Sequence, residues 1–148
     1  MLTETLQSLF TRDLEKLRSE ITLYQQEDNI WKIEKGIANS AGNLCLHLIG
    51  NLNAHIGNVL GKTGYIRNRD AEFSLKNIPR EELLTKIDET IAVVKTAIGN
   101  ISEDDLANEY PVLVFDNITS VEYMLVHLAT HLSYHLGQIN YHRRLIDL

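Results

Sequence analysis

A chain of 148 residues with 44% hydrophobic and 23% charged residues has the composition of a globular protein, and we expect residues 1–148 to form one helical domain. The net charge of −6 argues against a nucleic-acid-binding surface, which requires clustered Lys and Arg. The sequence shows no signal-peptide pattern and no apolar run of about twenty residues, so we expect no membrane association. The one cysteine, Cys45, excludes an internal disulfide and suits a reducing cytoplasm.

Apolar residues spaced by three and four predict four long amphipathic helices. The first runs from residue 2 to about 27 and the second from about Lys35 to Leu60, where glycines end it. The third begins at Pro79, a residue suited to a first helical turn, and continues to Gly99. The fourth opens with a capping box, Thr119-Ser120-Val121-Glu122, and runs to about residue 146.

The segments between these helices carry few strand signals. Residues 64–77 are predicted to be a charged connecting loop, and residues 102–105 a single turn of helix. The apolar run from Tyr110 to Phe115 has no partner strand, so we expect a loop packed over the helices. The pattern therefore predicts an all-α four-helix bundle, and the connections are long enough for a crossover.

Three histidines of the fourth helix, His127, His131 and His135, follow one another at intervals of four. Residues four apart lie on the same face of a helix, so two such imidazoles can bind one metal ion, as in the helical zinc-protease motif. That motif has a Glu after its first histidine, whereas Leu132 follows His131 here. The general base of the motif is missing, and we do not expect protease chemistry of that type.

Histidines border the apolar stripe of the fourth helix at His127, His131, His135 and His142, and that of the second helix at His47 and His55. Residues on such an edge face inward or into a cleft. If the two edges meet, His131, His135 and one histidine of the second helix can bind a metal between facing helices. The alternative is that these are structural histidines with hydrogen-bonded ring nitrogens.

Two segments carry a resemblance to a known family: residues 44–52, with His47, and residues 127–139, where two histidines four apart precede x-Gly-Gln. The chain resembles the DinB/YfiT-like family of four-helix metalloproteins. The resemblance implies that His47, His131 and His135 bind a divalent metal ion, commonly zinc or nickel. His55, two turns further along the same edge, is the competing choice in the second helix.

The resemblance also implies a direction for function, because characterised relatives resemble thiol-dependent transferases or isomerases. Three imidazoles leave at least one coordination position open, so a bound water or low-molecular-weight thiol would be activated. We therefore expect a thiol S-transferase or a hydrolase acting on a small-molecule substrate, with Glu34, Asp116 or a loop residue as the possible base. The alternatives are a metal-binding protein without catalysis and an interaction module with structural histidines.

Assembly is the last expectation. Tyr123, Tyr134 and Tyr141 form a stripe beside the histidines of the fourth helix, and residues 112–115 add an apolar loop. Many relatives in the family that the chain resembles are dimers, so we expect a homodimer that buries part of this surface. The alternative is that the loop only covers one end of its own bundle.

Overall fold

The computed structural model describes residues 1–34 and 36–148, and over these residues the chain is helical without a β-sheet. Its four long helices are α1 (Leu2–Leu23), α2 (Ala41–Leu52), α4 (Arg80–Gly99) and α5 (Val121–Ile146). The shorter elements are η1 (Glu27–Trp31), the π-helix η2 (Asn53–Asn58) that continues α2, α3 (Arg69–Ser74) and η3 (Asp104–Ala107). The predicted all-α helical bundle is confirmed.

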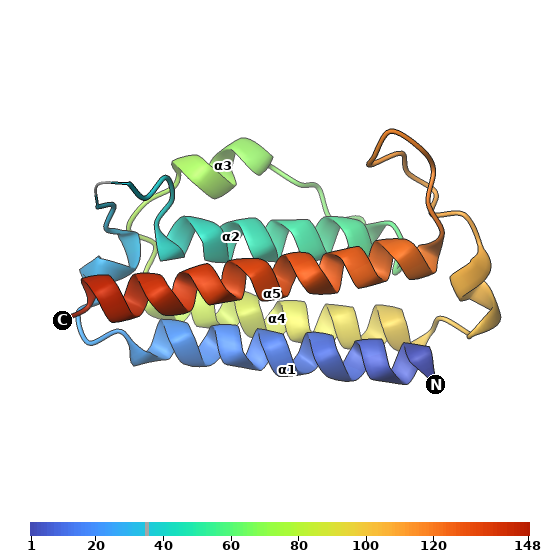
Figure 1. The fold of residues 1–148 in the computed structure, drawn as a ribbon, viewed down its shortest axis with the longest axis horizontal. Helices are drawn as coiled ribbons and strands as arrows, with labels where there is room; N and C mark the ends of the chain where they lie inside the picture. The colour runs from blue at the N-terminus through green and yellow to red at the C-terminus, as the bar shows by residue number, and fades with distance from the viewer. Residues whose placement is uncertain (35) are drawn as a thin grey trace.

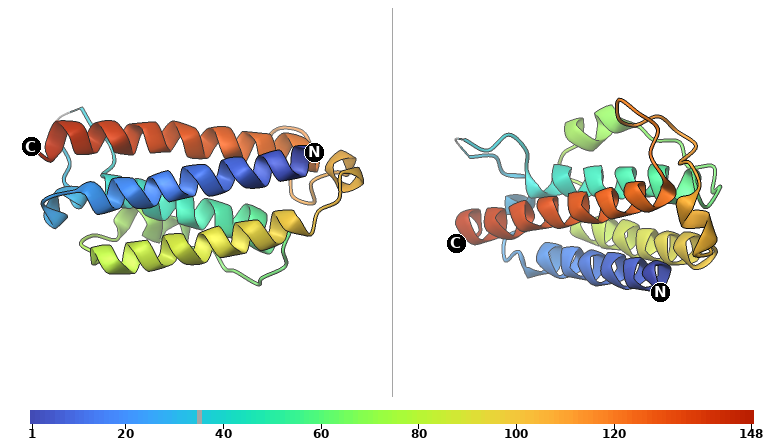
Figure 2. Two further views of the ribbon diagram at one scale, coloured as in Figure 1. Left: turned by 90° about the horizontal axis from the view of Figure 1, so that it is seen from below. Right: turned by 45° about the vertical axis from the view of Figure 1, so that its right-hand side comes forward.

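The long helices enclose one core of Leu, Ile, Val, Phe and Tyr side chains. α1 packs mainly against α4 and α5, and α2 packs against the same two helices, so α1 and α2 face each other across the bundle. α1 and α5 run in one direction and α2 and α4 in the other, as Figures 1 and 2 show. The connections α1–α2 and α4–α5 therefore each pass over one end of the bundle, between helices that lie diagonally opposite.

The connection between α2 and α4 is the long crossover of the bundle. These neighbouring helices run the same way, so the chain must return along the whole bundle before α4 begins. Residues 59–79 make this return on the outside of α2, and α3 lies on it, packed against α2 (Figure 1). Our expectation of a plain loop over residues 64–77 is wrong, because Asn68 caps a helical turn by accepting a hydrogen bond from the backbone N–H of Ala71.

Two helix starts also differ from the sequence expectation. α2 begins at Ala41, since the Ser40 side chain accepts from the Asn43 backbone N–H; the expected start, Lys35, lies outside the described residues. At α5 the cap is Ser120, which accepts from the backbone N–H of Tyr123, so the predicted capping box that begins at Thr119 is wrong. Neighbouring hydroxyl residues make such a one-residue shift hard to foresee from sequence.

The loop before α5 is anchored by Tyr110 and Phe115 and has exposed residues between and after them. Tyr110 is buried and its hydroxyl donates to the carbonyl oxygen of His55. Phe115 packs against the core and against the His127 ring, whereas Leu113 is 62% exposed, so the loop covers the bundle only in part. Within the described residues, none of the helices is both long and apolar enough to span a membrane.

Candidate metal centre

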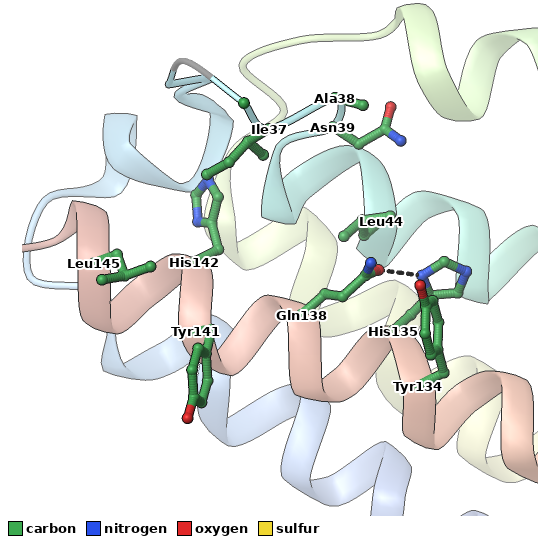
Figure 3. A pocket seen from close by; sticks show the side chains of 11 residues that line it. Ile37, Ala38, Asn39, Leu44, Tyr134, His135, Gln138, Tyr141, His142 and Leu145 are labelled. Atoms are coloured by element: carbon green, nitrogen blue, oxygen red, sulfur yellow. Dashed lines mark hydrogen bonds between the residues drawn. The ribbon is translucent and has the colours of Figure 1, made fainter.

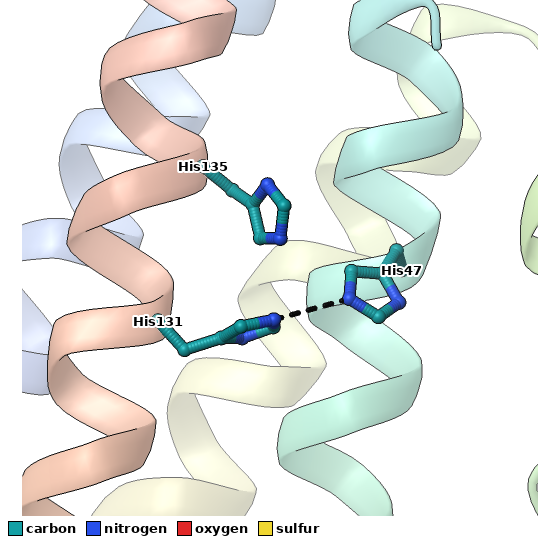
Figure 4. A group of neighbouring side chains, drawn as sticks. All are labelled: His47, His131 and His135. Atoms are coloured by element: carbon teal, nitrogen blue, oxygen red, sulfur yellow. Dashed lines mark hydrogen bonds between the residues drawn. The ribbon is translucent and has the colours of Figure 1, made fainter. Parts of the chain in front are cut away.

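Three imidazoles from two helices converge on one point between α2 and α5. His131 and His135 are one turn apart on α5, and His47 faces them from α2 (Figure 4). One ligand atom from each of the three lies within 4.8 Å of the other two. The antiparallel packing of α2 on α5 thus brings together the two histidine edges, and His47 is the second-helix histidine at this point.

The closest pair already has the spacing of two ligands on one ion. Nε2 of His47 lies 3.2 Å from Nε2 of His131. Zinc binds imidazole nitrogen at about 2.0–2.1 Å, so two ligands at a tetrahedral angle are about 3.3 Å apart. The donor set consists of imidazoles that are half-buried or buried, which suits a borderline-soft divalent ion. These residues fit a bound metal.

The outer nitrogen of His47 is held by a buried carboxylate. Nδ1 of His47 donates to Oε1 of Glu72 across 3.0 Å, and both residues are buried, at 7% and 6% exposure. Arg67, from the return connection (residues 59–79), donates from both Nε and Nη2 to the same carboxylate. Phe73 of α3 packs on the His47 ring with a centroid distance of 5.0 Å. The return connection thereby fixes both the tautomer and the plane of this imidazole.

A glycine makes room for this carboxylate. A Cβ atom on Gly50 would lie 1.9 Å from Oε2 of Glu72, so no larger residue fits while Glu72 keeps its position. Gly50 lies one turn after His47 on α2, where a side chain would otherwise separate α2 from α3. The close approach of α3 to the metal-site face of α2 therefore depends on this glycine.

His135 is oriented in the same manner from its own helix. Its Nδ1 donates to Oε1 of Gln138 across 2.7 Å, three residues further along α5. With a proton on Nδ1 in both His135 and His47, each Nε2 carries the lone pair that a metal needs. Nδ1 of His131 is buried and has no hydrogen-bond partner within the described part of the chain, which is unusual for a buried polar atom.

The electrostatics favour neutral rings. Burial lowers the pKa of His131 to about 4, and the neighbouring His135 and His47 act in the same direction. Burial also lowers the pKa of His47, although Glu72 opposes this effect. Metal ligation requires the unprotonated imidazole, so these two residues are ready to bind an ion near neutral pH.

The other histidines have structural contacts. His142 is buried with both ring nitrogens engaged, Nδ1 with the Tyr24 hydroxyl at 2.6 Å and Nε2 with the Lys32 carbonyl at 2.8 Å. The His55 ring lies beside Tyr110, which also bonds its carbonyl group. His127 packs edge-on against Phe115 of the preceding loop.

A comparison with protein-family models matches residues 4–147 to the family described as "protein of unknown function (DUF1572)". The chain belongs to the DUF1572 family. No curated protein matches the chain. The matched range of this DUF1572 protein takes in both histidine-bearing helices and residues 59–79 between α2 and α4.

Sequence reasoning missed Glu72 and Arg67 in this DUF1572 protein. Both lie in the segment expected to be a loop, and neither falls on a histidine edge. The available signal was Asn68 followed by acidic residues in the next turn, which marks a helix start but not a contact with His47. Of the suggested bases, Glu34 pairs at the surface with Lys32, and Asp116 is exposed in the loop before α5.

The single cysteine lies on α2 but takes no part in this centre. Cys45 is two residues before His47, and successive helical positions are turned by about 100°, so two steps put Cys45 on another face. Its side chain is buried in the core, and burial raises the pKa of its thiol to about 12. Cys45 is therefore a core residue, and the candidate ligands are imidazoles.

Proposed function

We propose that His47, His131 and His135 bind one divalent metal ion through their Nε2 atoms. The observation that carries the proposal is the convergence of three imidazoles. In two of them Nδ1–H donates a hydrogen bond, from His47 to Glu72 and from His135 to Gln138. Such second contacts orient metal-binding histidines and raise their basicity. Zinc and nickel are the proposed ions, since both accept imidazole nitrogen.

We further propose that the centre is catalytic. Three protein ligands leave a coordination position open, and a divalent ion with such a position lowers the pKa of a bound water or thiol, which supplies a nucleophile at neutral pH. The residues around the ligands orient them. Glu72 accepts a hydrogen bond from Nδ1–H of His47, and Arg67 balances the charge of Glu72. Because its carboxylate is used in this way, we do not assign Glu72 as the general base.

The resemblance to the DinB/YfiT-like family supports a reaction of the thiol S-transferase type, with hydrolysis as the alternative. The Gln of the x-Gly-Gln motif after His135 is Gln138, and its side chain accepts the hydrogen bond from Nδ1 of His135. Under this proposal the substrate is a small molecule and a low-molecular-weight thiol is the partner. A homodimer, with the Tyr stripe of α5 in or near the interface, is part of the same proposal.

Metal analysis of protein expressed without an affinity tag tests the centre. We expect about one equivalent of divalent metal per chain in the wild type and loss of stoichiometric metal in His131→Ala and His135→Ala. His55→Ala is the matched control and should keep the metal. Full metal content in both α5 variants would show that the histidines are structural.

Activity assays of the loaded protein separate the remaining classes. Thiols combined with electrophilic substrates test for transfer, and an ester and amide panel tests for hydrolysis. A turnover that disappears in His131→Ala supports catalysis at this centre. A metal-loaded protein that is inactive in both panels would favour a non-catalytic metal-binding bundle.

A further inference from the structure

A pocket of about 510 Å³ lies directly beside the candidate metal centre. His135 forms part of its wall, so the pocket and the centre share a residue (Figure 3). Ile37 from the α1–α2 connection, Leu44 from α2 and Leu145 from α5 supply apolar surface, and Tyr134 lies at the His135 end. The volume is within the range of small-molecule sites, about 300–1,000 Å³.

The described residues that line this pocket include no Asp, Glu, Lys or Arg. Its second histidine, His142, has both ring nitrogens occupied, and burial lowers its pKa, so it is neutral near pH 7. The polar groups that remain are the carboxamides of Asn39 and Gln138 and the hydroxyl of Tyr134, since the hydroxyl of Tyr141 points away from the other lining residues (Figure 3). A charged group placed here would lose hydration without gaining a counter-charge from the described lining.

We propose that this pocket binds the uncharged, predominantly apolar part of the substrate, whose polar end reaches the metal beside His135. The inference rests on the proposed function and deepens it by naming a substrate class: neutral organic molecules with an aryl or alkyl body. Apolar contact with Ile37 and Leu44 supplies affinity, and the shared His135 sets the distance between the body and the reacting end.

Hydroxamates that share one metal-binding head and differ in the body test this inference. Acetohydroxamate, benzohydroxamate and 4-carboxybenzohydroxamate are titrated calorimetrically into the zinc-loaded protein. We expect benzohydroxamate to bind at least about tenfold more tightly than acetohydroxamate, because the ring leaves water for the pocket. We expect the added carboxylate to remove this advantage, since no cation in the described lining receives it.

A matched pair of variants locates the effect. Ile37→Asp places a carboxylate in the pocket wall, whereas Ile33→Asp places one at a 49% exposed position of the same connection, outside the lining. The benzohydroxamate advantage should fall in Ile37→Asp and persist in Ile33→Asp. Circular dichroism and zinc analysis are the controls that check whether both variants keep the fold and the ion.

Each outcome has a defined meaning. Equal affinities for the methyl and phenyl probes overturn the pocket and leave the metal centre standing, because both heads still bind the ion. An advantage that survives in Ile37→Asp overturns the assigned location. Failure to load zinc at all overturns the proposed function and this inference with it.

Discussion

Nδ1 of His47 on α2 donates a hydrogen bond across 3.0 Å to the carboxylate of Glu72 on α3. This contact joins the candidate metal centre to the connection that returns along the outside of the bundle. The same carboxylate receives Arg67, so a buried negative charge is paired on one side and oriented toward an imidazole on the other. A carboxylate in this position orients the ligand and raises its affinity for a metal.

Glu72→Gln should weaken metal binding by about 10- to 100-fold, because the amide keeps the shape but removes the charge that supports His47. The measurement is the zinc dissociation constant by competition with a chelating dye. Glu82→Gln, an exposed position on α4, is the control and should bind as the wild type does. Unchanged affinity in Glu72→Gln would limit Glu72 to a structural role.

Gly50→Ala should destabilise the protein and also weaken metal binding. The added Cβ would lie 1.9 Å from Oε2 of Glu72, so the carboxylate must leave its contacts with Arg67 and His47. Overpacking of this kind costs about 1–3 kcal/mol. The matched control is Gly137→Ala on α5, where nothing lies within 4 Å and alanine should stabilise the helix by roughly 0.5–1 kcal/mol. Urea unfolding of the metal-free proteins checks both signs.

Acid should weaken the metal-free fold through His131. The pKa of this ring is about 4 in the folded protein and 6.5 for the unperturbed side chain. Between these values the unfolded chain binds a proton that the folded chain does not, so the free energy of unfolding falls as the pH is lowered below 6.5. His131→Gln should lose less stability than the wild type between pH 7.5 and pH 5. The same loss in both proteins would contradict this assignment.

A homodimer should give a mass near twice 16.9 kDa by light scattering at micromolar concentration. The exposed Tyr123 and Tyr134 on α5, together with Leu113 of the loop, are the surface that we expect a partner copy to cover. A specific dimer buries at least about 1,000 Å² in total. A protein that stays monomeric over a wide concentration range would rule this assembly out.

Much of the α5 half of the site could be predicted because it is local. Periodicity alone places His131 and His135 one turn apart on one face, and the helix is long enough for its phase to be reliable. The four helices could be predicted for the same reason. Their bounds were less accurate, since caps such as Ser120 depend on hydrogen bonds that neighbouring residues could equally make.

The choice between His47 and His55 needed the structure. Eight residues separate them, about 12 Å along an α-helix, so only one can reach the ion that His131 binds. Which one does so depends on the axial position of α2 relative to α5. This position is set by tertiary packing, which local sequence patterns do not reveal. In the structure, His55 lies in the π-helix that continues α2, beside Tyr110.

The contact of Glu72 with His47 could not be predicted from the sequence for a related reason. Glu72 lies 25 residues from its partner, His47, on a six-residue helix too short to show a clear periodicity. Its importance comes from the parallel placement of α2 and α4, which forces the chain back over the face that carries His47. A connection that passed over another face would leave the same Glu at the surface.

The burial of Cys45 has a consequence for any sulfur chemistry. Its thiol lies in the core with a pKa raised to about 12, so it is neither exposed nor ionised at neutral pH. No other cysteine exists in the chain. A sulfur nucleophile that reaches the three histidines must therefore arrive as a co-substrate from solution, and the rate of such a reaction would follow the cellular supply of that thiol.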